Sequence, residues 1–294
     1  MIQIHLDVDN IWVYENEHGI KTPFKKEDIY TKALPVFLDI LKKTNSKVTF
    51  MIVGADLEMK VCRDFCRKAI KMGHEIGNHS WSHSDDFEQF SYEEKKMEIQ
   101  KTHELLTKVC GKKPIGFAGP GYHTDADTTR TLQKLGYKYD SSVMPGISQT
   151  LMKFYIQIKN KKGMIKIFKV GKYLMNRHGP YILAGNNSRN QIWELPISVL
   201  PILTIPIHST FVYFFGPVYK KITMMYLHSK KGYLLYLFHA IDFLEYPPTP
   251  NHPIIPFRYS LEERIAFSSE VLKILVKNNG GPIKTSRELL RELK

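Results

Sequence analysis

Two histidines in residues 77–83, GNHSWSH, are spaced so that both imidazoles could bind one metal ion. His79 and His83 follow a short strand-like segment, and Asp7 and Asp9 follow an apolar run near the N-terminus. Two imidazoles and one carboxylate form a facial metal site that leaves positions open for water and substrate. A zinc ion in such a site lowers the pKa of a bound water to about 7, which provides a nucleophile at neutral pH.

Two further groups could complete a hydrolytic reaction at such a metal. A second carboxylate could take a proton from the water, and a histidine across the site could protonate the leaving group. His239 ends the apolar run GYLLYLF and could be that histidine. Each pattern alone also has a structural explanation, as a chance His-x-x-x-His pair, a turn-capping Asp-x-Asp or a hydrogen-bonded core histidine. Their joint placement after predicted strands favours a metal-dependent hydrolase.

The elements that would position these groups alternate between strand and helix. Apolar or β-branched runs predict strands at 2–8, 48–53, 74–78, 115–117 and 232–240. Helical spacing and capping signals predict helices at 27–43, up to about 72, at 91–110, 124–135 and 260–277, and over the last residues. Such alternation predicts an α/β fold with a parallel sheet, whose functional groups gather at the C-terminal ends of the strands.

Composition and charge restrict the class of protein. The 294 residues are 43% hydrophobic and 24% charged, which is typical of one globular domain over 1–294. Residues 143–231, rich in proline, aromatic residues and lysine, interrupt the alternation and are interpreted as an insertion. Three cysteines suit a reducing compartment, and the N-terminus lacks the features of a secretory signal, so a cytoplasmic location is expected. The net charge of +13 favours an anionic partner.

Five stretches of the chain resemble, in order, the five motifs of the polysaccharide deacetylase (NodB-homology) family. They are LDVDN at 6–10, GHEIGNHSWSH at 73–83, GFAGPGY at 116–122, YDSS at 139–142 and YLFHA at 236–240. The resemblance implies a distorted (β/α)7 barrel. It also implies a hydrolase that removes N-acyl groups from amino sugars with a divalent metal, usually Zn²⁺, with Mn²⁺ or Co²⁺ as alternatives.

The same resemblance implies a role for each candidate residue, although the sequence itself does not decide which aspartate is base and which is ligand. Asp7 matches the catalytic base and His239 the catalytic acid. The ligands and the remaining binding groups are matched in the same way: Asp9, His79 and His83 for the metal, backbone N–H groups near Gly121 and Tyr122 for the oxyanion, and Asp140 for the substrate.

One position departs from the family pattern. The third motif normally carries an arginine that orients the base, and Ala118 stands there in this chain. Two explanations are open: an inactive binding protein, or a branch that orients the base by other means. Members that deacetylate or deformylate undecaprenyl-phosphate-linked amino sugars also lack this arginine, and the FAGPGY, LDVDN and FHA segments resemble that branch.

A basic segment points to the partner. Residues 151–177 hold eight lysines and arginines and no acid, interleaved with large apolar residues, which is typical of a helix in a membrane interface. A partly buried helix with a solvated lysine face is the alternative. Residues 195–227 are apolar but broken by prolines, so they could form strands or loops that line an acyl-chain groove or dip shallowly into lipid. Nucleic acid is not expected, because no recognition motif is present.

The expected function is therefore N-deacetylation of a polyprenyl-phosphate-linked amino sugar, in the modification of an envelope glycolipid such as lipid A. The enzyme would be peripheral to the anionic inner leaflet of the cytoplasmic membrane. Two alternatives are open: the same chemistry on a soluble sugar or exopolysaccharide precursor, and a non-catalytic lipid- or glycan-binding protein on the same fold. The sugar, the choice between acetyl and formyl, and the oligomeric state are also open.

Overall fold

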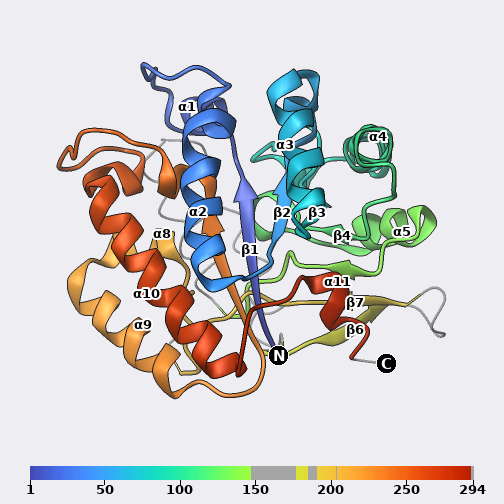
Figure 1. Cartoon of the computed structure of the whole chain (residues 1–294). Helices are drawn as coiled ribbons and strands as arrows, with labels where there is room; N and C mark the ends of the chain where they lie inside the picture. Colours follow the sequence, from blue (N-terminus) through green and yellow to red (C-terminus); the bar gives the residue numbers. More distant parts are fainter. Residues whose placement is uncertain (147–176, 185–190, 203, 293–294) are drawn as a thin grey trace.

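The computed structural model describes residues 1–146, 177–184, 191–202 and 204–292. Within these residues, eight strands form one sheet in the order β6-β7-β5-β4-β3-β2-β1-β8 (Figure 1). The strands are β1 (Ile2–Val8), β2 (Thr49–Ile52), β3 (Glu75–Asn78), β4 (Gly116–Phe117), β5 (Tyr139–Asp140), β6 (Tyr181–Ala184), β7 (Ile192–Glu194) and β8 (Leu234–His239). Each neighbouring pair is parallel apart from β6 and β7, so the predicted α/β fold with a parallel sheet is confirmed.

Strand β1 explains how the sheet presents polar groups on its inner face. Its apolar residues join the main core with residues of the surrounding helices, while the alternate positions Gln3, His5 and Asp7 are buried polar residues. Residues two apart in a strand point to the same side, so these three share one face. Asp7 is in register with His239 on β8, which places the two side chains next to each other.

The sheet curves toward a barrel. The backbone after β7 runs beside β8, where the Ser198 N–H donates to the Leu235 carbonyl over 3.2 Å. The Leu235 N–H in turn donates to the Ser198 hydroxyl over 2.9 Å. These bonds bring the far side of the sheet back to β8 and fit the expected distorted barrel.

The predicted helices are present. They are α2 (Leu34–Thr44), α3 (Lys60–Lys71), α4 (Tyr92–Cys110), α5 (Ala126–Leu135) and α10 (Leu261–Asn279), with a short α11 (Ser286–Leu289) that is briefer than expected. Capping boxes begin α4 at Ser91 and α10 at Ser260, as their sequences indicate. The Ser286 hydroxyl of α11 lies 2.7 Å from Nε2 of His5, so this helix contacts the polar interior near the start of β1.

Several elements are not predicted by the sequence. They are α1 (Ile11–His18), α8 (Ser209–Phe215), α9 (Pro217–Ser229), β5, β6, β7 and the short helices η2 (Gly54–Glu58), η3 (Phe87–Gln89), η4 (Pro120–Tyr122), η6 (Ala240–Phe243) and η7 (Ile255–Arg258). The short helix η1 (Ile29–Ala33) lies within the helix predicted at 27–43 and leads into α2. The expectation of strands or loops over 195–227 is wrong for its C-terminal part. Gly216 separates two helices there, and Pro217 occupies a first helical position, where a proline is tolerated.

The segment interpreted as an insertion also contributes to the sheet. Strand β7 pairs with β5 in parallel, and α9 packs against α10. Most of the basic segment at 151–177 lies outside the described residues. Of the residues that are described, none belongs to a helix long and apolar enough to cross a membrane.

Candidate active site

Asp9, His79 and His83 converge at the C-terminal ends of β1 and β3. Oδ1 of Asp9 lies 3.3 Å from Nε2 of His79 and 3.2 Å from Nε2 of His83. The three candidate ligand atoms lie within 4.8 Å of one another, and in the described part of the chain no other set of three or more such residues does so. The structure therefore brings together the three residues expected as metal ligands.

The donor set fits a divalent cation. Nδ1 of His79 lies 2.7 Å from the Ala118 carbonyl oxygen, which can only accept a hydrogen bond. Nδ1 must therefore carry the proton, and in the neutral ring Nε2 directs its lone pair toward Asp9. Oδ1 of Asp9 is buried without a hydrogen-bond partner among the described residues. Nε2 of His79 and Oδ1 of Asp9 are then two acceptors 3.3 Å apart, and a proton or a metal ion must lie between them.

The pKa values of the three groups show where that proton sits in the absence of metal. Burial opposes ionisation of Asp9, but His83 and His79 outweigh it and hold the Asp9 pKa below its usual range. Burial also opposes the charge of His79, yet Asp7 and Asp9 raise the His79 pKa to about 9. Burial lowers the pKa of His83 to about 4. A cation that binds here would therefore displace one proton from His79.

The loop between the two histidines is held by α4. Ser80 and His83 have φ of 60° and 46°, which are left-handed conformations that most residues avoid. Oε2 of Glu98 on α4 accepts the N–H groups of Trp81 and Ser82 at 2.9 and 2.8 Å. Two charge-assisted hydrogen bonds to one carboxylate stabilise this conformation and fix the distance between the two imidazoles.

Asp7 and His239 complete the site beside the metal ligands. Oδ2 of Asp7 lies 3.8 Å from Nε2 of His79 and 4.0 Å from Nε2 of His239. Burial raises the Asp7 pKa above its usual value, which suits a proton acceptor. Nδ1 of His239 lies 3.2 Å from the Thr210 hydroxyl, and the His239 N–H donates to Asp242 over 3.0 Å.

These contacts show what surrounds Asp7 in place of the arginine that the family motif carries at position 118. Ala118 is buried and presents its backbone carbonyl to His79. In the described portion of the protein, the ion-pair partners of Asp7 are His79 and His239, and no arginine pairs with it. Two imidazoles therefore flank the aspartate that matches the family's base.

The loop of the third motif reaches the same site, but Asp140 does not. Gly121 and Tyr122 line the pocket with φ of 60° and 58°. The Tyr122 N–H donates to the Gly119 carbonyl over 3.2 Å. Asp140, expected to bind the substrate, is fully buried, accepts a hydrogen bond from Ser142 and is not among the residues that line the pocket. The Ser142 hydroxyl also accepts the Gly119 N–H over 2.7 Å, so Asp140 supports the loop from beneath.

The three candidate metal ligands, Asp7, His239 and the loop of the third motif line one pocket of about 310 Å³. Its walls include residues that the sequence does not identify: Tyr14 and Glu17 of α1, Asp85 and Glu88, Phe211 and Phe214 of α8, His208, and residues 253–256 with Arg258. His123, beside the third motif, also lines it and lies 3.5 Å from Asp125. No sequence pattern gives His208 a partner, yet its Nε2 lies 3.3 Å from the Tyr122 hydroxyl inside the pocket. The pocket therefore combines an acidic side with an apolar wall.

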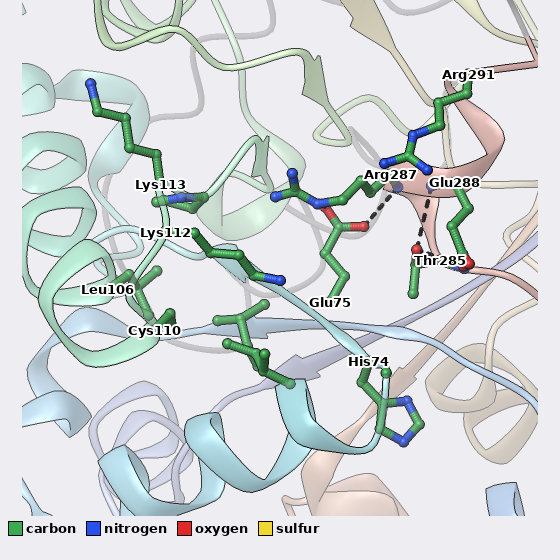
Figure 2. A pocket seen from close by; sticks show the side chains of 14 residues that line it. His74, Glu75, Leu106, Cys110, Lys112, Lys113, Thr285, Arg287, Glu288 and Arg291 are labelled. Carbon is green, nitrogen blue, oxygen red and sulfur yellow. Dashed lines mark hydrogen bonds and ion pairs between the residues drawn. The ribbon is translucent and has the colours of Figure 1, made fainter.

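A second hollow of about 230 Å³ lies near the start of β3, away from the metal ligands. Figure 2 shows its basic side chains, with the Glu75 carboxylate next to the Arg287 guanidinium. The Arg287 N–H donates to Glu75 over 2.8 Å, so the buried acid is already paired. This hollow contains none of the three converging ligands, and the candidate chemistry lies in the first pocket.

Part of the chain is similar in sequence to known proteins. Residues 26–139 match the sequence model of the polysaccharide deacetylase family. Relatives include a peptidoglycan deacetylase of Helicobacter pylori (29% identical, covering 38% of this chain and 37% of that protein) and a peptidoglycan-N-acetylglucosamine deacetylase of Bacillus cereus (29%, covering 38% and 42%). The match thus spans about two fifths of these relatives.

The fold likeness extends over the whole chain. A provisionally assigned polysaccharide deacetylase from Mycobacterium smegmatis superimposes with a TM-score of 0.59 at 15% identity, covering 99% of this chain and 88% of that one. Over residues 26–139 the chain is therefore similar in sequence to the polysaccharide deacetylase family, and the structural likeness at 15% identity shows a shared fold. Asp7, Asp9 and His239 lie outside the matched residues 26–139, so their place in the site rests on the structure.

Proposed function

We propose that this protein, related through residues 26–139 to polysaccharide deacetylases, is a metal-dependent hydrolase that removes an N-acetyl group from a polyprenyl-phosphate-linked amino sugar. The observation that carries the proposal is the convergence of three metal-ligating groups with Asp7 and His239 in one pocket. Hydrolysis of an amide needs an activated water, a proton acceptor for it and a proton donor for the leaving amine. The pocket offers a candidate for each.

The roles of the residues follow from their positions. A divalent cation held by Asp9, His79 and His83, Zn²⁺ in the first instance and Mn²⁺ or Co²⁺ otherwise, would activate the water and polarise the amide carbonyl. Asp7, with its raised pKa, takes a proton from the water as the water oxygen bonds to the acyl carbon. His239 protonates the nitrogen as the C–N bond breaks, so the products are acetate and the free amine. Thr210 and Asp242 hold His239 in place for this transfer.

The apolar wall of the pocket favours a lipid-linked substrate over a purely polar one. Phe211 and Phe214 of α8 and the segment 253–256 line it on one side. A soluble sugar offers mostly hydroxyl groups, which would gain little from such a wall. An isoprenoid chain attached to the sugar would be partly desolvated against these side chains.

An exposed apolar stripe supports a membrane surface as the place of action. Val218, Ile222 and Met225 follow one another on one face of α9, and Val218 and Met225 are 74% and 64% exposed. The half-exposed Phe215 precedes them. Residues 195–241 hold four lysines and no acidic residue, which complements an anionic lipid surface. We propose that this face docks on the inner leaflet of the cytoplasmic membrane.

A flotation experiment tests the docking face. We expect the triple variant Val218→Ser, Ile222→Ser, Met225→Ser to bind vesicles of anionic phospholipid about 100-fold more weakly than the unaltered protein. The reason is that three side chains lose on the order of 1 kcal/mol each of burial in the interface. Met97→Ser on α4 is the matched control, because Met97 is 62% exposed on another surface. Equal binding of the triple variant, or binding to uncharged vesicles alone, would contradict the docking face.

A direct assay tests the activity. The purified, zinc-loaded protein is given a polyprenyl-phosphate-linked sugar carrying either an N-acetyl or an N-formyl group, and mass spectrometry follows the free amine. We expect release of acetate that stops on chelation and returns when Zn²⁺ is added. Release of formate from the formyl compound alone would show that the acyl group removed is formyl and not acetyl. A protein that binds no metal and is unaffected by chelators would contradict the proposal of a metal-dependent hydrolase.

A second candidate function is deacetylation of a soluble sugar or polysaccharide, and the names of the two peptidoglycan deacetylases favour it. Turnover of a water-soluble N-acetyl amino sugar without vesicles, with no turnover of the lipid-linked compound, would support it. A non-catalytic binding protein would instead hold metal and glycan without turnover.

A further inference from the structure

We infer that Arg258 binds the phosphate group of the substrate, an inference that rests on the proposed function and identifies where a sugar phosphate is recognised. Arg258 ends η7 and is the one lysine or arginine among the described residues that line the active-site pocket. An anion that enters this pocket therefore has a single permanently charged cationic side chain to meet there.

The Arg258 guanidinium is oriented by one hydrogen bond, while its two terminal nitrogens keep N–H groups that can bind a ligand. Its Nε–H donates to the His252 carbonyl over 2.9 Å, which fixes the plane of the group. No hydrogen bond or ion pair engages Nη1 or Nη2 within the part of the chain that the structure describes. A planar fork of free N–H groups matches two phosphate oxygens, and a guanidinium stays charged at any physiological pH.

The backbone that carries Arg258 is held firmly. Phe257 stacks on Tyr246 with ring centroids 4.6 Å apart. The Tyr259 hydroxyl donates to the Tyr213 carbonyl over 2.9 Å, which ties the residues after η7 to α8. Because neighbours on both sides are anchored, the position of Arg258 relative to the α8 wall is defined before a ligand binds.

The remaining charge of the pocket makes Arg258 decisive for an anion. The acidic side chains of the lining are Asp7, Asp9, Glu17, Asp85 and Glu88. A phosphate near them would meet like charge, whereas a phosphate beside Arg258 is paired. The apolar residues 253–256 lie two positions before Arg258 and line the same pocket, so a chain bonded to that phosphate would lie against them. Arg258 and the metal ligands line the same pocket, so the phosphate and the amide of one substrate would be bound in a single cavity.

The test compares three N-acetyl amino sugars on the zinc-loaded protein: a methyl glycoside without phosphate, a methyl phosphodiester and a short prenyl phosphodiester. For Arg258→Gln we expect kcat/KM to fall about 10- to 100-fold on both phosphodiesters, chiefly through KM, and to stay unchanged on the glycoside. Arg258→Lys should recover part of the loss, because it restores the charge without the fork. Arg291→Gln, an exposed arginine at the second hollow, is the matched control.

Each outcome decides the inference. An equal loss on all three compounds, or no loss on any, would overturn it. A preference of the unaltered protein for the prenyl over the methyl phosphodiester assigns the phosphate to a lipid, and equal use assigns it to a soluble sugar phosphate. If the unaltered protein hydrolyses none of them, the proposed function fails. Calorimetric titration with the prenyl phosphodiester then still tests Arg258, and binding that Arg258→Gln leaves unchanged would overturn the inference.

Discussion

His79→Ala is expected to remove both the metal and the activity. Nε2 of His79 is one of three ligand atoms in the cluster, and its ring is fixed by the Ala118 carbonyl. Alanine leaves one imidazole and one carboxylate, too few to hold a cation firmly at this site. We expect the bound zinc per protein to fall from about one to near zero. We also expect kcat/KM for acetate release to fall by at least about 1,000-fold, because water activation and carbonyl polarisation are lost together.

The measurement pairs metal analysis with turnover on one preparation. Zinc content is determined after dialysis, and acetate release is followed on the lipid-linked N-acetyl sugar. His178→Ala is the matched control, since His178 lies outside the pocket. A thermal unfolding curve shows whether the variant is folded. A folded His79→Ala protein that keeps full zinc content would refute the ligand assignment, and one that loses zinc but keeps its turnover would refute metal dependence.

Much of the site could be predicted from sequence because strands impose a fixed direction on their side chains. The alternation in β1 places Asp7 on the inner face with Gln3 and His5, and the parallel sheet brings the ends of β1, β3 and β8 to one edge. The spacing in GNHSWSH then brings His83 to the same site only if the loop between the two histidines has a fixed conformation. Glu98 stabilises that conformation by accepting hydrogen bonds from two backbone N–H groups of the loop. Regular geometry and short loops are what make these residues predictable.

The rest depends on contacts between segments far apart in the chain. His208 and Arg258 follow no local pattern, and they reach the pocket because α8 packs beside β8 and η7 packs against α8. Asp140 shows the converse case, since a motif match gives the position of this residue in the chain but does not show that its side chain is buried away from the pocket. Asp140 ends β5 beneath the third-motif loop, where its carboxylate accepts a hydrogen bond from the Ser142 hydroxyl. Residues 209–229 form helices despite their proline, because Gly216 separates α8 from α9 and Pro217 stands at a helix start.

Asp7→Asn is expected to separate catalysis from metal binding. The amide has the shape of the carboxylate but cannot accept a proton from water at neutral pH. Asp7 lies 3.8 Å from Nε2 of His79 but is not one of the three clustered ligands, so the metal should stay. We expect kcat to fall about 100- to 10,000-fold, the usual contribution of general base catalysis, with KM and zinc content little changed.

This variant also decides between the enzyme and a binding protein on the same fold. A chain that had lost its base function with the arginine of the third motif would behave identically before and after the Asp7→Asn substitution in every assay. The structure offers a reason for the opposite result, because burial raises the Asp7 pKa and His79 and His239 flank its carboxylate. Asp39→Asn, an exposed aspartate on α2, is the control for the change of charge. Undiminished turnover in Asp7→Asn would remove this residue from the mechanism, whereas a zinc-loaded protein with strongly reduced kcat would identify Asp7 as the base that works without the family's arginine.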